Sequence, residues 1–332
     1  MKTSTDFILT THVGSLPRPK ALEEKLLKQE MGVLSEEEAA TMPAEVSDAV
    51  KWAVQRQRDM GITVIDDGEM SKYAYSTYAR QRMTGLTGSD QMLAISDIMD
   101  FPEFAKRMKL EIKTPACVGP VSYLETDALR ADIANLQAAL AGSGAEEGFM
   151  NAPSPGIMAA YMPNQYYDTR EAYLYALAEA IKTEYDAIVG AGLILQIDCP
   201  DLAAGRHMNL PPMEASAFRA EVALLIEVLN HALRDVPADR VRMHLCWGNY
   251  EGPHHHDVNR RAKLTPYRRP ILTPPFGSQA VIPVVDRRGP RTTTRTVRCA
   301  GGGVRGRSLL THRVNRRGWG SGGRGFRLSS GF

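Results

Sequence analysis

One recurring pattern constrains the fold of this chain most: an amphipathic helix, a break at Gly or Pro, and a short apolar run that ends in polar residues. In its first occurrence, a helical stretch begins near Pro43, which suits an early helical position, and ends at Gly61. The run ITVIDDGE at 62–69 follows, and its apolar residues give way to acids that include Glu69. Alternation of helices with such runs is typical of an α/β fold with a parallel sheet.

Two further units repeat this layout. The run LILQIDCPD at 193–201 follows a helical period and ends in Asp198. A later helical period precedes a predicted strand at 241–246, which carries His244 and Cys246. In each unit the residues capable of chemistry stand at the carboxyl end of a predicted strand.

The position of these polar residues favours one architecture. In a (β/α)8 barrel, the carboxyl ends of all strands meet at one mouth, where active sites form. A doubly wound open sheet also binds ligands at carboxyl strand ends and is the alternative. With 332 residues the chain is long enough for a single large barrel. We therefore predict an α/β fold of the (β/α)8 TIM-barrel type.

Residues 259–332 differ in composition from the rest of the chain. They hold 16 Arg and one Lys against the single acid Asp286, a net charge of +16, whereas the residues before them carry −14. A segment so rich in Arg, Gly and Pro, with little helical periodicity, buries too little apolar surface to fold alone. We predict a barrel catalytic domain over 1–258 and a basic tail over 259–332 that is not a folded domain.

This tail has two interpretations. An Arg/Gly-rich segment suits nucleic-acid binding, because Arg contacts phosphates and stacks on bases. The abrupt change midway through an α/β unit instead favours a coding sequence that has left its reading frame, since GC-rich codons read out of register yield Arg, Gly, Pro and Thr. We favour the second and expect no nucleic-acid partner. Sequencing the coding DNA across codons 250–265 tests this hypothesis, and an intact frame would refute it.

Other features exclude further classes of protein. The N-terminal segment MKTSTDFILTTHVGS lacks the apolar core of a signal peptide, and no apolar stretch approaches the roughly 20 residues that span a bilayer. The four cysteines are too few and too scattered for a disulfide framework. We expect a cytoplasmic protein without a membrane partner, whose cysteines are buried or bind a metal.

The pair His244 and Cys246 suggests which metal. In an extended strand, residues two apart point to one face. Zn²⁺ takes nitrogen and sulfur ligands in a shell of about four, so this pair supplies half of such a shell. The alternative is a packed thiol beside a hydrogen-bonded imidazole.

Five motifs in order carry a resemblance to a known family: TTHVGSLPRP at 10–19, DDGE at 66–69, GPVSYL at 119–124, LQIDCPDLA at 195–203 and HLCWGNYEGPHHHDV at 244–258. Together they resemble the catalytic domain of the cobalamin-independent methionine synthases, and most closely the single-barrel members. The resemblance implies a methyltransferase that moves a methyl group from 5-methyltetrahydrofolate, a polyglutamate co-substrate, to the thiol of homocysteine. It also implies a Zn²⁺ ion that holds this thiol.

The resemblance assigns roles to single residues. His244 and Cys246 match zinc ligands, and Ser15, Glu69 and Asp198 match residues that bind the amino-acid part of homocysteine. Two fixed carboxylates suit an ammonium group, and a turn at Gly14–Ser15 offers N–H donors to a carboxylate. No catalytic acid is assigned.

The chain also departs from the family. The remaining zinc ligands, a carboxylate and a second cysteine, would lie in 259–332, and neither is recognisable there. We therefore predict about six of eight βα units, a barrel incomplete at its C-terminal units, and weak zinc binding. The cluster 254–257, HHHD, looks like a metal site, but it follows the predicted zinc strand in a loop, and we expect a substrate-facing or solvated segment. Cys199 is expected to be a buried structural thiol.

Three other functions stay open. Zinc-dependent alkyl transfer to another thiol, such as coenzyme M, uses the same metal chemistry, but Glu69 and Asp198 would repel its sulfonate. Nucleic-acid binding through the tail predicts salt-dependent affinity that is lost on removing 259–332. An inactive relic is the third. The sequence does not indicate the oligomeric state.

Overall fold

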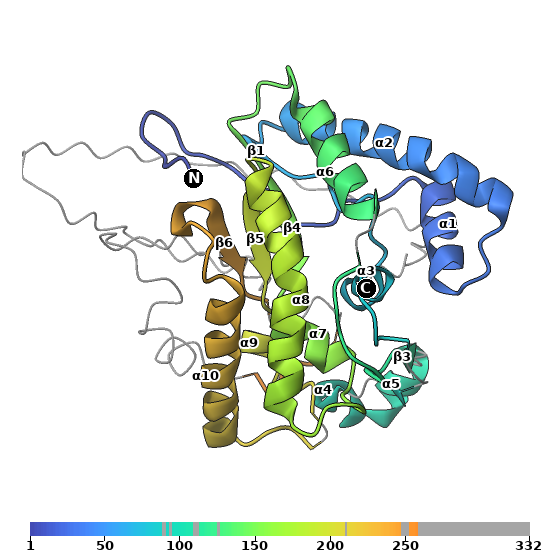
Figure 1. The fold of residues 1–332 in the computed structure, drawn as a ribbon, viewed down its shortest axis with the longest axis vertical. Helices are drawn as coiled ribbons and strands as arrows, with labels where there is room; N and C mark the ends of the chain where they lie inside the picture. The colour runs from blue at the N-terminus through green and yellow to red at the C-terminus, as the bar shows by residue number, and fades with distance from the viewer. Residues whose placement is uncertain are drawn as a thin grey trace, which may run out of the picture. The chain divides into compact units, whose positions relative to one another are not determined.

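The computed structural model describes residues 1–87, 91–92, 95–108, 113–124, 127–209, 211–246 and 252–257, all within one structural unit (Figure 1). The predictions made for 259–332 lie outside these residues. The helices are α1 (Lys20–Glu30), α2 (Glu36–Asp59), α3 (Tyr75–Arg82), α4 (Ser96–Met99), α5 (Pro102–Met108), α6 (Asp127–Leu140), α7 (Pro155–Tyr161), α8 (Arg170–Gly190), α9 (Asp201–Ala204) and α10 (Ala215–Ala232). The strands are β1 (Val64–Ile65), β2 (Gln91–Met92), β3 (Lys113–Thr114), β4 (Glu147–Pro153), β5 (Ile194–Asp198) and β6 (Val241–His244).

Four of these strands form a parallel sheet in the order β1, β4, β5 and β6. Thr11 extends the sheet beyond β1 through a parallel bridge to Val64. The strands of this sheet follow one another in space as they do along the chain, and β2 and β3 form a separate antiparallel pair. A doubly wound sheet reverses its strand order at a switch point, and the described strands show no such reversal. This strand order is that of a barrel. The number of βα units, about six of eight, stays a prediction.

Residues along the long strands alternate between two faces. One face carries matched residues across β4, β5 and β6: first the polar Asn151, Gln196 and Arg242, and two residues later Pro153, Asp198 and His244. The opposite face is apolar, and its buried residues join the main core to which the helices contribute. This alternation follows from the two-residue period of a strand, and it places the predicted polar residues Asp198 and His244 side by side.

The sheet is curled. The guanidinium of Arg242, on β6, donates a hydrogen bond of 3.0 Å from Nη1 to Thr11 Oγ1, at the opposite edge of the described sheet. In a flat sheet these two edges would lie about 19 Å apart, because neighbouring strands are about 4.8 Å apart. A direct hydrogen bond between them therefore requires the curvature that a barrel has.

Helices α8 and α10 pack against each other beside the sheet, and Figure 1 shows them running along β5 and β6. The predicted start of α2 near Pro43 was wrong. Ser35 caps this helix in a reciprocal capping box with Glu38, and Pro43 lies inside the helix. The capping box satisfies two N-terminal donors, so the helix begins a full two turns before the proline.

A buried network of ion pairs and hydrogen bonds joins α3 and α6, which lie between β1 and β4 in the chain, to α8. Arg82, on α3, contacts Asp132 on α6 and donates to Glu184 Oε1 on α8 at 3.1 Å. Tyr78 and Tyr123 also donate to the Glu184 carboxylate, at 3.2 and 2.9 Å. The network fastens α3 and α6 to α8, next to the carboxyl ends of the strands. Among the described helices, none is long and apolar enough to cross a membrane.

Candidate active site

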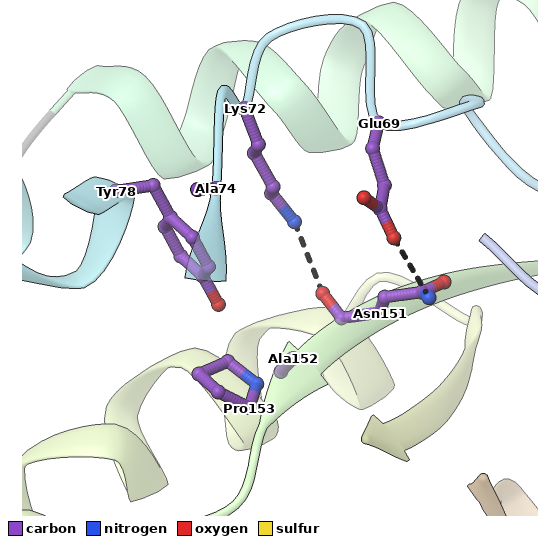
Figure 2. A pocket seen from close by; sticks show the side chains of 7 residues that line it. All are labelled: Glu69, Lys72, Ala74, Tyr78, Asn151, Ala152 and Pro153. Carbon is purple, nitrogen blue, oxygen red and sulfur yellow. Dashed lines mark hydrogen bonds between the residues drawn. The ribbon is translucent and has the colours of Figure 1, made fainter. Parts of the chain in front are cut away.

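Polar side chains at the carboxyl ends of the strands gather around Asn151 of β4. Its Nδ2 donates to Glu69 Oε1 at 3.1 Å, to Asp198 Oδ2 at 3.0 Å and to the Val13 carbonyl at 3.1 Å. Figure 2 shows the Asn151 amide directed at the Glu69 carboxylate. One amide thus joins the N-terminal segment, the loop after β1 and the end of β5. Since an NH₂ group has two hydrogens for these three acceptors, the bonding is shared.

Glu69 has an unusual backbone conformation. Its φ is 55°, the single positive value among the described non-glycine residues, in a region that such residues seldom adopt. The Glu69 carbonyl accepts hydrogen bonds from Arg18 Nη2 at 2.8 Å and from the Lys72 backbone N–H at 3.1 Å. The Glu69 N–H donates to Asp67 Oδ1 at 2.8 Å. These bonds hold a strained residue in place, as is common at functional sites.

The Gly14–Ser15 turn lies against this carboxylate. The Ser15 hydroxyl donates a hydrogen bond to Glu69 Oε2. A Cβ atom at Gly14 would lie 2.7 Å from Glu69 Oε1 and 3.1 Å from Asn151 Nδ2. A larger residue at this position would therefore displace the Glu69 carboxylate, which glycine leaves in place.

Asp198 is fully buried at the end of β5. Gln196 Nε2 donates to Asp198 Oδ1 at 2.8 Å and to the Val13 carbonyl at 2.7 Å, and Gln196 Oε1 accepts from Arg242 Nε at 2.9 Å. The Arg242 guanidinium lies 3.6 Å from the centre of the Phe149 ring, and burial lowers its pKa to about 10. Arg242 thus stays charged near neutral pH while it orients Gln196.

The site carries an excess of buried carboxylates. Burial raises the pKa of Glu69, and the negative charge of Asp198 raises it further, against the opposing effects of Ser15, Lys72 and Arg18. Burial also raises the pKa of Asp66 and of Asp67, and the charge of Asp67 adds to the rise at Asp66. Raised carboxyl pKa values mean that the anionic forms lack full compensation. A bound cation would therefore be stabilised here.

His244 and Cys246 lie next to this cluster. His244 is paired in register with Asp198, and its backbone carbonyl accepts from the Cys199 N–H at 2.9 Å. Burial lowers the pKa of His244, although Glu69 opposes the shift, so the neutral imidazole is favoured at neutral pH. Cys246 follows the end of β6 by two residues and is half-buried. A neutral imidazole and a thiol are the donor set that Zn²⁺ prefers. Within the part of the chain described here, no third ligand atom is grouped with them.

A small pocket opens beside the cluster and is shown in Figure 2. Its lining comprises Glu69, Lys72, Ala74, Tyr78, Asn151, Ala152 and Pro153. The Lys72 ammonium donates to the Asn151 carbonyl at 3.0 Å and lies 4.9 Å from the centre of the Tyr78 ring. The pocket therefore offers both an anionic group, Glu69, and a cationic group, Lys72.

The structure brings Ser15, Glu69 and Asp198 within hydrogen-bond reach of one another or of Asn151, and places His244 beside Asp198. Asn151, Gln196 and Lys72 were not among the site residues predicted from the sequence. A signal for Asn151 was present, because this polar residue stands near the carboxyl end of the run EGFMNAP, just before the helix cap Ser154. The expectation for Cys199 is confirmed, since its side chain is fully buried and burial raises its pKa well above the usual value.

Comparison with known proteins shows the family. Residues 7–253 match the family model of the catalytic domain of cobalamin-independent synthase. The chain therefore belongs to the cobalamin-independent methionine synthase catalytic-domain family, as the five motifs indicated.

Curated relatives include the methionine synthases of Saccharolobus solfataricus, 26% identical over 242 residues, and of Sulfurisphaera tokodaii, 27% identical over 250 residues. Each match covers 73% of this chain, which spans 63% and 62% of these relatives.

Solved structures support the fold. A B12-independent methionine synthase from Shewanella sp. W3-18-1, in complex with selenomethionine, has a TM-score of 0.56 at 22% identity, over 74% of this chain and 63% of that one. A putative vitamin-B12 independent methionine synthase from Listeria monocytogenes has a TM-score of 0.51 at 20% identity, over 75% and 68%. Both neighbours are TIM barrels, so the predicted fold class is confirmed.

Proposed function

We propose that this chain binds homocysteine at the Glu69–Asp198 cluster and supports zinc-dependent methyl transfer to its thiol from 5-methyltetrahydrofolate. The single observation that carries the proposal is the pair of carboxylates, the buried Asp198 and the partly buried Glu69, joined by Asn151 and placed beside His244. Family membership supports the reaction class. Small-molecule substrates and a cytoplasmic location fit the same family.

In this proposal the amino-acid end of the substrate is recognised by charge. The ammonium of homocysteine binds between Glu69 and Asp198, where it offsets two negative charges. The Gly14–Ser15 turn supplies donors to the substrate carboxylate, and Lys72 adds a nearby cation. The selenomethionine in the Shewanella structure is an amino acid of the same general form as the product, which agrees with amino-acid recognition in this chain.

His244 and Cys246 would hold the zinc ion. When bound, the ion would lower the pKa of the homocysteine thiol, so that the sulfur reacts as the thiolate. The pleat alignment of His244 with Asp198 puts this end of β6 beside the ammonium site. The substrate would then extend from the carboxylates toward the metal. We keep the prediction that the chain as written binds zinc weakly and methylates homocysteine poorly.

Methionine binding tests amino-acid recognition without the need for zinc or activity. In calorimetric titrations of the full chain, we expect methionine to bind at least about tenfold more tightly than 4-(methylthio)butanoate, which lacks the ammonium. One hydrogen bond to a charged group contributes about 1.5–3 kcal/mol, enough for this ratio. Glu69→Gln should remove most of the preference.

Glu179→Gln is the matched control, because Glu179 is an exposed surface acid paired with His231 and Arg234. It should leave the preference unchanged. Equal binding of the two ligands by the unmodified chain would contradict the proposed ammonium site. Tighter binding of coenzyme M than of homocysteine to the zinc-loaded chain would favour the alternative alkyl transfer instead.

A further inference from the structure

A second group of metal-ligating side chains lies apart from His244 and Cys246. Three segments meet there: α4, the turn after α9, and residues 252–257. Asp97, His207 and Asp257 each offer one ligand atom, and these atoms all lie within 4.8 Å of one another. The side chains of Asp97 and His207 are 0% and 2% exposed. A cluster with two buried members differs from the acidic patches that are common on surfaces.

The distances within this group match those of a coordination shell. His207 Nδ1 lies 3.3 Å from Asp97 Oδ2 and 3.5 Å from Asp257 Oδ1. With metal bonds of about 2.0–2.1 Å, adjacent ligands of a tetrahedral ion lie about 3.3–3.4 Å apart. Direct hydrogen bonds between charged groups are shorter, about 2.7–2.9 Å. The observed spacing is therefore closer to that of ligands around an ion than to that of a hydrogen-bonded pair.

The neighbouring histidines provide an internal comparison. His255 Nε2 and His256 Nε2 lie 2.8 and 2.7 Å from Asp100 Oδ2, which are ordinary charge-assisted hydrogen bonds. These two contacts lie nearer the surface, since the Asp100 side chain is 45% exposed. The contacts of His207 with Asp97 and Asp257 are longer than these two, as is the 3.3 Å contact between Nδ1 of the more exposed His255 and Asp97 Oδ1.

Hydrogen bonds hold the three segments together without a metal. The His256 N–H donates to Asp97 Oδ1 at 2.9 Å, and Arg206 Nη1 donates to the His256 carbonyl at 2.7 Å. The Ser96 N–H donates to the His207 carbonyl at 2.8 Å. Asp257 Oδ1 is buried and accepts no hydrogen bond from the described residues. The three segments are thus already in place, and a buried carboxylate oxygen without a hydrogen bond from the described residues lies among them.

We propose that Asp97, His207 and Asp257 form a second metal site, which binds a divalent transition-metal ion such as Zn²⁺ and fastens residues 252–257 to α4 and α9. One imidazole and two carboxylates suit such an ion, whereas Mg²⁺ and Ca²⁺ prefer oxygen ligands alone. Three protein ligands leave one position for water. This differs from the expectation that 254–257 is solvated or faces the substrate.

The test separates the two metal sites. In the full chain, His244→Ala combined with Cys246→Ser removes the first site, and Zn²⁺ binding is then measured by competition with a chromophoric chelator. We expect this double variant to keep one equivalent of Zn²⁺. Adding Asp257→Ala should weaken the retained binding at least about tenfold, since even the loss of an outer-shell partner costs 10–100-fold in affinity.

His231→Gln is the matched control, because His231 is a surface histidine paired with Glu179, and it should leave the affinity unchanged. Circular dichroism of the metal-free variants checks that Asp257→Ala remains folded. If it does not, X-ray absorption of the Zn²⁺-loaded double variant decides: a shell of nitrogen and oxygen that includes one imidazole supports the site. No Zn²⁺ bound by the double variant, an affinity that Asp257→Ala leaves unchanged, or a shell without imidazole would overturn the proposal.

Discussion

Asn151→Ala tests how the neighbouring carboxylates of Glu69 and Asp198 are accommodated. The substitution removes the amide that donates to Glu69 at 3.1 Å and to Asp198 at 3.0 Å. Each hydrogen bond to a charged group contributes about 1.5–3 kcal/mol, so we expect a loss of about 3–6 kcal/mol of unfolding free energy at pH 8. If water enters the space left by the Asn151 side chain, the loss of unfolding free energy should lie at the lower end of this range.

The loss should depend on pH. Removing the donor raises the folded-state pKa of Glu69 beyond the rise that burial and Asp198 already cause. Between the ordinary carboxyl pKa and this raised value, the folded state binds more protons than the unfolded state, so stability falls as pH increases. The penalty of Asn151→Ala should therefore be largest at pH 8 and shrink as the pH falls through the folded pKa of Glu69.

Urea unfolding of the variant and the unmodified chain at pH 5 and pH 8 measures both effects. Asn164→Ala is the matched control, since among the described residues the Asn164 side chain bonds to neutral backbone groups alone, those of Tyr166 and Tyr167. It should cost about 1–2 kcal/mol, as expected for neutral hydrogen bonds, and equally at both pH values. An Asn151→Ala penalty below about 1 kcal/mol at pH 8, or one that is the same at pH 5, would refute the reasoning.

Three further predictions concern the turn, the ion network and the metal. Gly14→Ala should displace the Glu69 carboxylate and weaken methionine binding about tenfold, with a loss of unfolding free energy below about 2 kcal/mol; calorimetry and urea unfolding measure the two effects, and unchanged binding would contradict the close approach. Arg82→Leu should cost about 3–5 kcal/mol in urea unfolding, because it leaves the buried Glu184 without its cation; a cost below about 1 kcal/mol would mean that the network contributes little. Replacing residues 259–332 by the matching segment of a complete relative should raise zinc retention after dialysis against a mild chelator, and Cys246→Ser in that protein should abolish it; equal retention with and without the replacement would show that the zinc shell is already complete.

The sequence by itself determined the family and three helix–strand units, with the polar residues that follow β1, β5 and β6. These depend on local patterns: the apolar period, glycine and proline breaks, and short motifs such as DDGE and LQIDCPDLA. Cys199 was expected to be buried and is buried, while the start of α2 was misplaced because Pro43 outweighed the Ser35–Glu38 capping box.

Only the tertiary structure decided how the site is held together. Asn151 bonds to Glu69 and Asp198, which are 82 and 47 residues away along the chain, and no local pattern specifies such partners. Arg242 reaches Thr11 only because the sheet curls, and Asp97 meets His207 and Asp257 only because α4 packs against two later segments. A sequence shows which side chains are capable of chemistry, but burial and distance depend on packing between distant segments, and these set their pKa values and their partners.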